Sequence, residues 1–238
     1  TPAVITGKPV ALGGSLGRDD ATGRGGFYVL RQLKSDLGIN PETSRIILQG
    51  FGNASFHCAR LLYDEGYRIV GLSDSTSAVY DSDGMNPYAV MEHKHRTKSI
   101  ADAPTNGVAQ QLDNAKLLEA ECDVLIPAAV ENQITEANAG DIKASVILEL
   151  ANGPVTPAAD AILDKNGVRV IPDILANSGG VTVSYFEWVQ NKAGYYWPVE
   201  EVHAKLKAMM EPETRRIWEL ARDQALSLRT AAYVHALE

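Results

Sequence analysis

Gly50, Gly52 and Ser55 form a Gly-x-Gly-x-x-Ser pattern between an apolar run and a segment with helical periodicity. Gly50 permits a tight turn from strand to helix, and the absent side chain at Gly52 lets the backbone approach a diphosphate. The start of the helix adds free N–H groups and partial positive charge, which favour an anion. Ser replaces the usual Gly or Ala at the third position, but it is small enough for close packing of helix on sheet. The turn predicts a dinucleotide-binding site. The residues expected to contact the coenzyme are Gly50, Phe51, Gly52, Asn53 and Ala54.

Asp74 lies 24 residues after Gly50, at the end of the next apolar run, where an acid can bond the ribose of a dinucleotide. We expect Asp74 and its neighbour Ser75 to contact the coenzyme. A carboxylate there repels a 2′-phosphate, so it favours NAD, with NADP possible. Two alternatives stay open. The glycines could form a tight turn that binds no ligand. Asp74 could instead point away, leaving room for a phosphate beside the hydroxyls of Ser73, Ser75, Thr76 and Ser77.

Short apolar runs alternate with helical patterns along most of the chain. The runs that predict buried strands are 45–49, 68–72, 124–126, 146–148 and 168–171. The segments that predict helices among them are 19–36, 53–65, 87–96, 113–120 and 157–165. This alternation predicts an α/β fold, Rossmann-like and doubly wound, with a mostly parallel sheet and helices on both faces.

The two ends of the chain differ in character from its centre. Residues 1–17 are rich in Gly and Pro and are expected to form a loop. From about Gly180 onward the pattern becomes helical, with further helices expected near 199–226 and 229–238. We therefore expect an NAD(P)-binding Rossmann-like domain over residues 1–190 and a helical C-terminal extension over residues 191–238.

Small and amide-bearing residues follow the other predicted strands. Ala128 and Ala129 come after one strand, Asn152 after the next, and Asn177 after the last. Ligands of open α/β sheets bind beyond the carboxyl ends of the strands. Small residues leave room for a flat ring, and Asn amides can bond ribose hydroxyls or a carboxamide. Taken singly, each Asn also suits a turn or a helix cap, but together at one edge they favour a coenzyme site.

Composition and charge argue against several classes of protein. The 238 residues carry a net charge of −8 with no run of Lys or Arg, which argues against a nucleic-acid partner. No apolar run reaches the roughly 18 residues of a membrane span, and no signal peptide is visible. Two cysteines without ligand spacing predict a reducing cytoplasm and no metal site. The pair His93 and His95 is expected on a solvated helix face.

Several longer stretches resemble the glutamate dehydrogenase family, in the family's order and over nearly the whole chain. They are residues 6–9, 13–18, 21–25, 50–53, 127–132, 151–154, 172–191 and 229–233. The resemblance covers only the family's second, nucleotide-binding domain and implies that the first domain is absent from this chain. It also implies reversible NAD(P)-dependent oxidative deamination of L-glutamate to 2-oxoglutarate and ammonia. The family usually forms homohexamers, so a homo-oligomer is expected of the full-length protein.

The resemblance assigns coenzyme contacts by position. Thr22 and Asn53 would bond the nicotinamide carboxamide and neighbouring coenzyme groups. Asn152 and Asn177 would bind near the nicotinamide ribose, and residues 128–129 would border its path. These assignments agree with what the strand-end residues predict on their own.

The amino-acid substrate is assigned to three further positions by the same resemblance. Arg18 would lie near the cleft between the family's two domains, and Val181 and Ser184 would touch the substrate side chain. A hydroxyl donor at Ser184 suits the second carboxylate of glutamate, whereas a leucine-type dehydrogenase would prefer an apolar residue. The alternatives are a dehydrogenase of leucine, valine or phenylalanine, a stand-alone non-catalytic dinucleotide-binding module, and a doubly wound domain that binds no dinucleotide.

No catalytic residue is assigned to this chain. In the family, a Lys of lowered pKa and a proton-shuttling carboxylate come from the first domain. Lys8 belongs to the N-terminal loop, and the adjacent His57 and Cys58 point in different directions on a helix, so they are expected to pack. The chain is therefore expected to bind nucleotide without turnover. Other lysines are expected to be solvated, among them Lys94, Lys98, Lys143 and Lys192.

Overall fold

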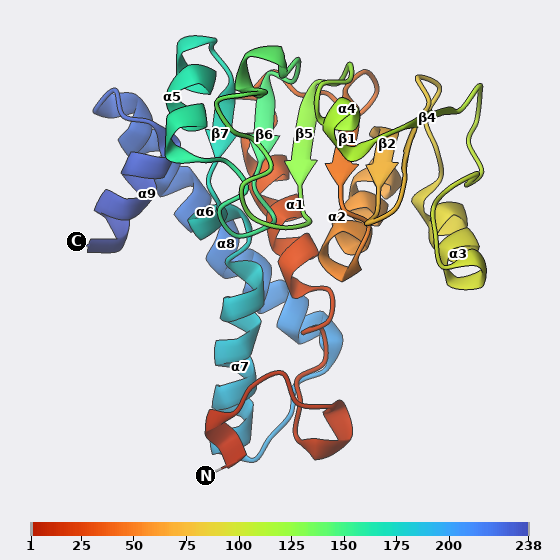
Figure 1. Cartoon of the computed structure of the whole chain (residues 1–238). Coiled ribbons are helices and arrows are strands. Elements are labelled where there is room, and N and C mark those ends of the chain that lie inside the picture. The colour runs from red at the N-terminus through yellow and green to blue at the C-terminus, as the bar shows by residue number, and fades with distance from the viewer. Residues whose placement is uncertain (1, 238) are drawn as a thin grey trace.

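The computed structural model describes residues 2–237, and its strands form one seven-stranded sheet (Figure 1). Across the sheet the strands follow the order β4-β3-β2-β1-β5-β6-β7. In chain order they are β1 (Arg45–Gln49), β2 (Arg68–Ser73), β3 (Ala78–Tyr80), β4 (Gln110–Leu112), β5 (Val124–Pro127), β6 (Val146–Leu148) and β7 (Arg169–Ile171). Every apolar run that predicted a strand forms one, with bounds that agree to within one residue.

Most of the sheet is parallel. β1 pairs in parallel with β2 on one side and with β5 on the other, and β6 and β7 extend the parallel part. β3 and β4 pair antiparallel beyond β2, and the sequence did not predict either of them. The mostly parallel sheet is confirmed. The winding of the chain reverses between β1 and β5, which is where open α/β sheets bind ligands.

Nine helices and three short 3-10 turns accompany the strands within residues 2–237. The turns are Pro2–Val4, Val10–Leu12 and Ala139–Asp141. The helices are α1 (Ala21–Leu33), α2 (Asn53–Asp64), α3 (Pro87–Thr97), α4 (Asn114–Leu118), α5 (Pro157–Lys165), α6 (Asp173–Ala176), α7 (Gly179–Ala193), α8 (Val199–Asp223) and α9 (Leu228–Leu237).

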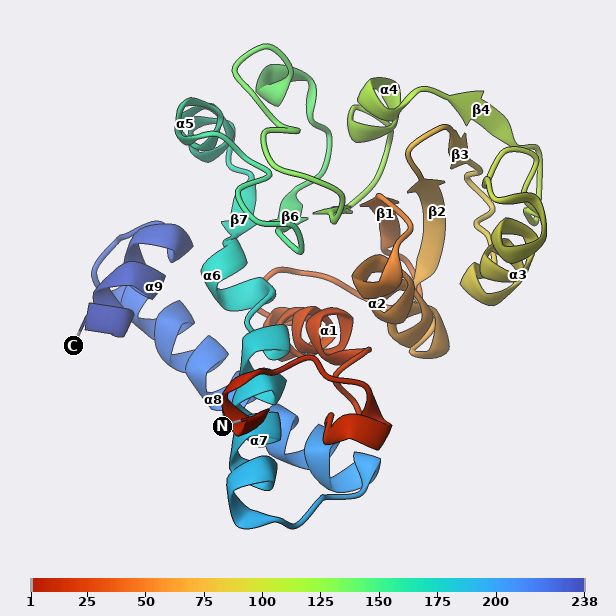
Figure 2. The same cartoon turned by 60° about the horizontal axis from the view of Figure 1, so that its bottom comes forward.

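Helices cover both faces of the sheet. Successive strand residues face opposite sides, so Ile46 and Leu48 join the core cluster that includes side chains of α1, α2 and α8. Ile47 instead packs with Leu117 of α4 and Leu163 of α5. Figure 2 shows α4 and α5 on one side of the sheet and α1, α2 and α8 on the other. The doubly wound prediction is therefore confirmed.

Capping residues explain where two of the helices begin. The Asn86 side chain accepts the amide of Tyr88 before α3, and the Thr156 hydroxyl accepts the amide of Ala159 before α5. Each cap is followed by a proline, whose fixed φ suits the first helical position. α5 occupies the range that the sequence predicts.

The C-terminal helices pack on the same core as the sheet. α8 runs along α1, with Val202, Leu206 and Met210 buried between them, and α9 returns to contact β7 and α6. The two helices expected near 199–226 and 229–238 are confirmed as α8 and α9, with residue 238 outside the described residues. The division at residue 190 stays a prediction. Within residues 2–237, no helix has both the length and the hydropathy that crossing a membrane requires.

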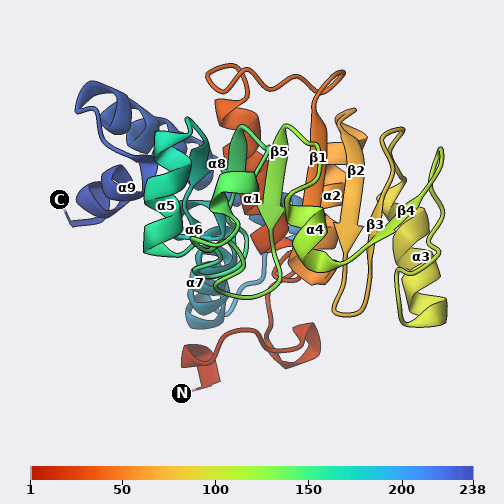
Figure 3. The same ribbon diagram turned by 45° about the horizontal axis from the view of Figure 1, so that its top comes forward.

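The carboxyl ends of the parallel strands share one side of the molecule. The arrowheads of β1, β2 and β5 point to the same end in Figures 1 and 3, and α7 and the N-terminal residues extend from that end. Residues that follow these strands are therefore brought together there.

Candidate functional site

Gly50 joins β1 to α2 with a φ of 86°, in the region that glycine adopts most readily. Its amide donates to the Ser73 hydroxyl at the end of β2, at 3.0 Å. A Cβ atom at Gly50 would lie 2.8 Å from the Cβ of Ala129, which follows β5. The tight turn that the sequence predicts is present, and it is enclosed between the ends of β2 and β5.

The first turn of α2 presents open hydrogen-bond donors. Gly52 precedes the helix in an extended conformation and has no side chain to bond its first amides. A Cβ at Gly52 would meet nothing within 4 Å, so the space in front of the turn is open. The Ser55 hydroxyl is buried and has no partner among residues 2–237. Open amides and the partial positive charge of the helix start fit the diphosphate of a dinucleotide, whereas the buried Ser55 hydroxyl does not face that space.

Hydrogen bonds hold the loops after β5 and β6 beside this turn. The amide of Ala128 donates to the last residue of β1 at 2.8 Å, and the amide of Ala151 donates to the last residue of β5 at 3.0 Å. The Asn177 side-chain amide donates to the side-chain oxygen of Asn152 at 2.7 Å. The strand-end residues that the sequence singled out therefore share one sheet edge: Ala128, Ala129, Asn152 and Asn177.

The start of α7 connects this edge to α1. The amide of Gly180 donates to the carbonyl of Asn177 at 3.3 Å. A Cβ at Gly180 would lie 2.5 Å from the Thr22 hydroxyl, so the two helices touch there. Asn53 of α2 donates to the Asp19 carbonyl just before α1. The expected coenzyme residues Thr22 and Asn53 thus lie in one continuous region.

Arg18 and Ser184 contact each other close to Thr22, beside the start of α7. Arg18 Nε donates to Ser184 Oγ at 3.0 Å, across 166 residues of sequence. Val181 lies about one turn before Ser184 on α7 and is 69% exposed. A guanidinium beside a hydroxyl offers several donors to one acceptor group, which suits a carboxylate. The three residues expected to meet the substrate come from the same two segments.

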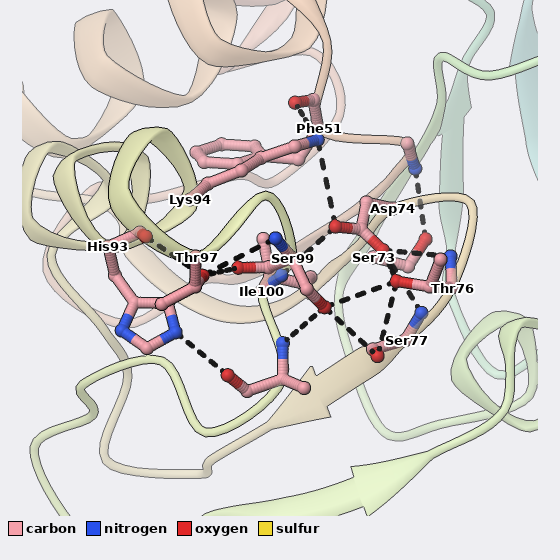
Figure 4. Close-up of polar contacts among 12 residues, drawn as sticks. Phe51, Ser73, Asp74, Thr76, Ser77, His93, Lys94, Thr97, Ser99 and Ile100 are labelled. Carbon is pink, nitrogen blue, oxygen red and sulfur yellow. Dashed lines mark hydrogen bonds and ion pairs between the residues drawn. The ribbon is translucent and has the colours of Figure 1, made fainter.

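Asp74 lies at the end of β2, and its carboxylate is turned into the protein (Figure 4). One oxygen accepts the amide and the hydroxyl of Thr76, at 2.9 and 2.8 Å, and the amide of Ser77 at 3.0 Å. The other oxygen accepts the amide of Ile100 at 3.0 Å. Burial raises the pKa of Asp74, but these hydrogen bonds outweigh burial and hold the pKa below its usual value. Ser75 is exposed beside it.

The prediction that Lys94 is simply solvated is wrong. Its Nζ donates to the carbonyl of Phe51 at 2.9 Å and lies 3.7 Å from the Asp74 carboxylate. α3 thereby brings a positive charge into the space between the glycine turn and the end of β2 (Figure 4). Lys94 and Phe51 are 43 residues apart in sequence, so this hydrogen bond becomes visible only when α3 is packed against the glycine turn.

A buried acid that the sequence did not single out holds together three helices next to the site. Asp20, just before α1, accepts hydrogen bonds from Arg24 at 2.7 Å and from Arg60 at 3.2 Å, and contacts His203 at 3.1 Å. Burial raises the pKa of Asp20, but Arg24 and His203 outweigh it and the net shift is downward. This cluster joins α1, α2 and α8 and fixes the position of the first turn of α1.

The N-terminal segment is attached to α7 by Lys8 and Glu187. Lys8 Nζ lies 2.6 Å from the Glu187 carboxylate, which is fully buried. The same carboxylate accepts the amides of Gly7 at 2.8 Å and of Lys8 at 3.3 Å. Lys8 thus belongs to the N-terminal loop, as the sequence predicts. Its ammonium group pairs with Glu187, and this ion pair attaches the loop to α7.

Two further expectations concern possible nucleophiles and metal ligands. Cys58 is fully buried, which raises the pKa of its thiol to about 12, and the packing interpretation is confirmed. His93 contacts the Ala101 carbonyl at 2.8 Å and is only partly exposed, so the solvated-face prediction is wrong for it, whereas His95 is exposed. Over residues 2–237, no set of three or more His, Cys, Asp or Glu side chains is arranged to hold a metal ion.

Comparison with known sequences gives consistent matches. The family model Glutamate/Leucine/Phenylalanine/Valine dehydrogenase matches residues 13–238. The NADP-specific glutamate dehydrogenase of Synechocystis sp. is 47% identical over 100% of this chain and 57% of its own length. The NAD-specific glutamate dehydrogenase of Staphylococcus aureus is 44% identical over 98% of this chain and 56% of its own length. The chain thus spans little more than half the length of these relatives.

Comparison with solved structures gives the same fold. The hetero-hexameric glutamate dehydrogenase of Thermus thermophilus superposes with a TM-score of 0.88 at 32% identity, over 98% of this chain and 54% of that one. The glutamate dehydrogenase of Peptoniphilus asaccharolyticus gives a TM-score of 0.83 at 36% identity, over 97% of this chain and 54% of that one. The Rossmann-like α/β prediction is confirmed.

Proposed function

Because the chain belongs to the Glutamate/Leucine/Phenylalanine/Valine dehydrogenase family, we propose that it is the coenzyme-binding part of an NAD(P)-dependent glutamate dehydrogenase. The complete reaction would be the reversible oxidative deamination of L-glutamate to 2-oxoglutarate and ammonia. Similarity to NADP-specific and NAD-specific glutamate dehydrogenases supports glutamate over leucine, valine or phenylalanine. One observation carries the proposal: the glycine turn of residues 50–53 adjoins the contact between Arg18 and Ser184 through Asp19 and Thr22.

Bound NAD(P) supplies the hydride acceptor, and this chain's residues bind and orient it. We assign the diphosphate to the glycine turn and to the open first amides of α2. Thr22 and Asn53 are assigned to the nicotinamide carboxamide, and Asn152 and Asn177 to the neighbouring ribose. The 2.7 Å bond between the two asparagines supports this assignment, because it fixes both amides at one edge while Asn152 stays exposed. Residues 128–129 leave room beside them.

We assign the side-chain carboxylate of glutamate to Arg18 and Ser184. A guanidinium and a hydroxyl can both donate to one carboxylate. An apolar substrate such as leucine would leave these two donors without an acceptor, which costs affinity. Val181, exposed on the same face of α7, is assigned to the methylene part of the substrate.

No proton-transfer group of the reaction is assigned to this chain. Deamination needs a lysine and a carboxylate that exchange protons with the substrate and with water. The two lysines near the site region are already engaged, Lys8 with Glu187 and Lys94 with Phe51. We therefore propose that the chain binds coenzyme without turning it over, and that the catalytic pair lies in the remaining part of a longer protein.

Fluorescence titration with NADH and NADPH, combined with an assay of glutamate oxidation, tests the proposed function. We expect saturable coenzyme binding and no turnover above background. Absence of binding to either coenzyme by the folded chain would contradict the proposed function. Glutamate-dependent turnover would contradict the assignment of the catalytic groups to another part of the protein.

Substrate class and assembly are tested on a full-length protein that contains this chain. Glutamate should be oxidised in preference to leucine, and Ser184→Val should reduce that preference by removing the hydroxyl donor. Thr182→Val is the matched control, because it removes a neighbouring hydroxyl that donates to the Ser178 carbonyl. We also propose a homo-oligomer for the full-length protein, and light scattering that gives a monomer mass would contradict it.

A further inference from the structure

The end of β2 is where an open α/β sheet receives the adenosine ribose of a dinucleotide. NAD carries a 2′-hydroxyl at that point, and NADP carries a 2′-phosphate. The side chains at this strand end therefore decide between the two coenzymes. Figure 4 shows them to be Asp74 with its loop, Ser99 behind that loop, and Lys94 from α3.

Asp74 presents no exposed acceptor to a ribose hydroxyl. One carboxylate oxygen already accepts three hydrogen bonds, from Thr76 and Ser77, and the other accepts the amide of Ile100 and lies 3.7 Å from Lys94 Nζ, while the side chain is only 3% exposed. Its backbone amide is also engaged, with the carbonyl of Ser77 at 2.8 Å. The strong acceptor that usually selects the 2′-hydroxyl of NAD is therefore absent from this surface.

The inward position of Asp74 is held by its surroundings. The Thr76 hydroxyl, one of its donors, also lies 3.1 Å from the Ser99 hydroxyl. Ser99 in turn accepts the amide of Ala101 at 3.1 Å. Outward rotation of Asp74 would leave the buried amide of Ile100 without a partner, so the carboxylate is expected to stay inward when coenzyme binds.

The charge of Asp74 is also neutralised locally. Three backbone amides point at the carboxylate, Lys94 Nζ lies 3.7 Å away, and the side chain is only 3% exposed. A 2′-phosphate at the end of β2 would therefore meet the Lys94 ammonium group beside a buried carboxylate whose charge is compensated.

Lys94 lies between the glycine turn and the end of β2, where the diphosphate and the adenosine ribose of a dinucleotide would bind. Its ammonium group has three N–H donors. One is used by the Phe51 carbonyl in the glycine turn, at 2.9 Å, and another faces Asp74. The third is available, and the side chain is 25% exposed, so it reaches the surface. The hydroxyls of Ser75 and Thr76 lie on exposed residues at the same strand end.

Given the proposed function, we infer that this chain prefers NADP(H) to NAD(H), with Lys94 binding the 2′-phosphate and Ser75 adding a hydroxyl donor. An ammonium group forms a charge-assisted hydrogen bond to a phosphate oxygen, and NAD has no group that can replace it. Asp74 then acts as a positioning residue, which orders its loop and fixes the position of Lys94.

Equilibrium titration of the chain with NADPH and with NADH, by fluorescence and by calorimetry, measures the preference. We expect NADPH to bind at least about tenfold more tightly. Adenosine 2′,5′-bisphosphate and adenosine 5′-monophosphate repeat the comparison without a nicotinamide ring. The preference for the bisphosphate should be similar, since the proposed contact lies at the adenosine end, and neither measurement depends on turnover.

Variants separate a 2′-phosphate contact from a structural role. Lys94→Gln should weaken NADPH binding about tenfold and change NADH binding by less than about threefold. Arg96→Gln removes the same charge from the same helix at an exposed position that faces another direction, and should change neither coenzyme's binding by more than about twofold. Should Lys94→Gln fail to fold, Ser75→Ala provides a second test at an exposed position, with a loss of about threefold expected for NADPH alone.

Each outcome decides the inference. Equal affinity for the two coenzymes, or tighter binding of NADH, overturns the NADP preference while leaving the proposed coenzyme site intact. Equal losses of NADPH and NADH in Lys94→Gln would show that Lys94 supports the glycine turn and does not contact a 2′-phosphate. No binding of any dinucleotide contradicts the proposed function as well.

Discussion

The guanidinium of Arg229, in α9, donates to both carboxylate oxygens of Glu149, at 2.8 and 3.0 Å, across 80 residues of sequence. Glu149 follows β6 and is fully buried. Its carboxylate also accepts the amide of Asp173 at 2.7 Å, and the Asp173 carboxylate accepts the amide of Gly153 at 2.8 Å. A chain of hydrogen bonds therefore runs from the C-terminal helix to the loop that carries Asn152.

We expect Arg229→Met to lower the free energy of unfolding by about 3–5 kcal/mol at neutral pH, because Glu149 would stay buried without its counter-charge. Burial raises the pKa of Glu149 and Arg229 opposes that rise, so the variant should raise this pKa further. A carboxyl group with a raised folded-state pKa adds stability at low pH that is lost as pH rises through that pKa. The destabilisation should thus be smaller at about pH 5 than at about pH 8, as measured by urea denaturation.

Arg222→Met is the matched control for this prediction. Arg222 lies on a neighbouring helix, pairs with Asp223, and has a side chain that is 63% exposed. Exposed ion pairs contribute little, so its loss should stay below about 0.5 kcal/mol. Similar losses in the two variants, or a loss at Arg229 that does not change with pH, would contradict the buried-charge explanation.

Glu187→Gln should also lose its destabilising effect as pH falls, but for a different reason and only at more acid pH. Burial raises the pKa of Glu187, but Lys8 and the amides of Gly7 and Lys8 outweigh it, so the pKa lies below the usual 4.5. A lowered folded-state pKa contributes stability that is present above the unfolded pKa and is lost as pH falls through the folded pKa. The variant should be less stable by about 3 kcal/mol at neutral pH, and this difference should shrink below about pH 4.5.

The control for Glu187 is Glu201→Gln, which removes an exposed acid paired with Lys205 at 3.5 Å. Its effect on the free energy of unfolding should stay below about 0.5 kcal/mol at every pH. Thermal unfolding monitored by circular dichroism across pH measures both variants. A constant difference between Glu187→Gln and the parent chain, down to acid pH, would rule out the carboxylate as its cause.

Asp74→Asn separates the structural role of Asp74 from a role in coenzyme choice. An Asn side chain has one acceptor oxygen in place of two, so at least one of the amides of Thr76, Ser77 and Ile100 loses its partner. We expect destabilisation of about 1–3 kcal/mol, with the NADPH-to-NADH affinity ratio changed by less than about threefold. Titration of the folded variant measures that ratio. A much larger rise in the ratio would mean that the carboxylate faces the coenzyme and repels its 2′-phosphate.

The central strands and the glycine turn could be predicted from sequence because one physical cause dominates each of them. Strands covered on both faces need continuous apolar runs, and residues 45–49 and 146–148 are of this kind. The start of α5 follows from Thr156 and Pro157, which specify a helix N-terminus locally. Gly50 was identifiable because its φ of 86° favours glycine strongly.

The edge of the sheet and the ion pairs could not be predicted in this way. β4 consists of three residues, of which Gln110 and Gln111 are exposed, so backbone pairing with β3 forms it without any apolar pattern. The position of α3 depends on how that antiparallel edge packs, and this is why Lys94 was expected in solvent. The pairing of Arg229 with Glu149 likewise depends on where α9 docks, which local propensities do not specify.

Gly50→Ala should disturb the fold and coenzyme binding together. The φ of 86° costs a non-glycine residue about 1–2 kcal/mol, and the new Cβ would lie 2.8 Å from the Cβ of Ala129. We expect a lower free energy of unfolding and weaker dinucleotide binding in the same variant. This variant alone does not separate a binding role from a structural one, and Gly52 provides the separation.

Gly52→Ala should leave the fold nearly unchanged and still weaken dinucleotide binding. The φ of Gly52 is −91°, which any residue adopts, and its Cβ would meet nothing within 4 Å. The loss of stability should stay below about 1 kcal/mol, the usual scale of changes at a helix N-cap. Because the methyl group would occupy the open space in front of the first amides of α2, the affinity for NADPH and for NADH should fall at least about tenfold. Parent-like affinity in a folded Gly52→Ala chain would mean that the diphosphate does not bind at this turn.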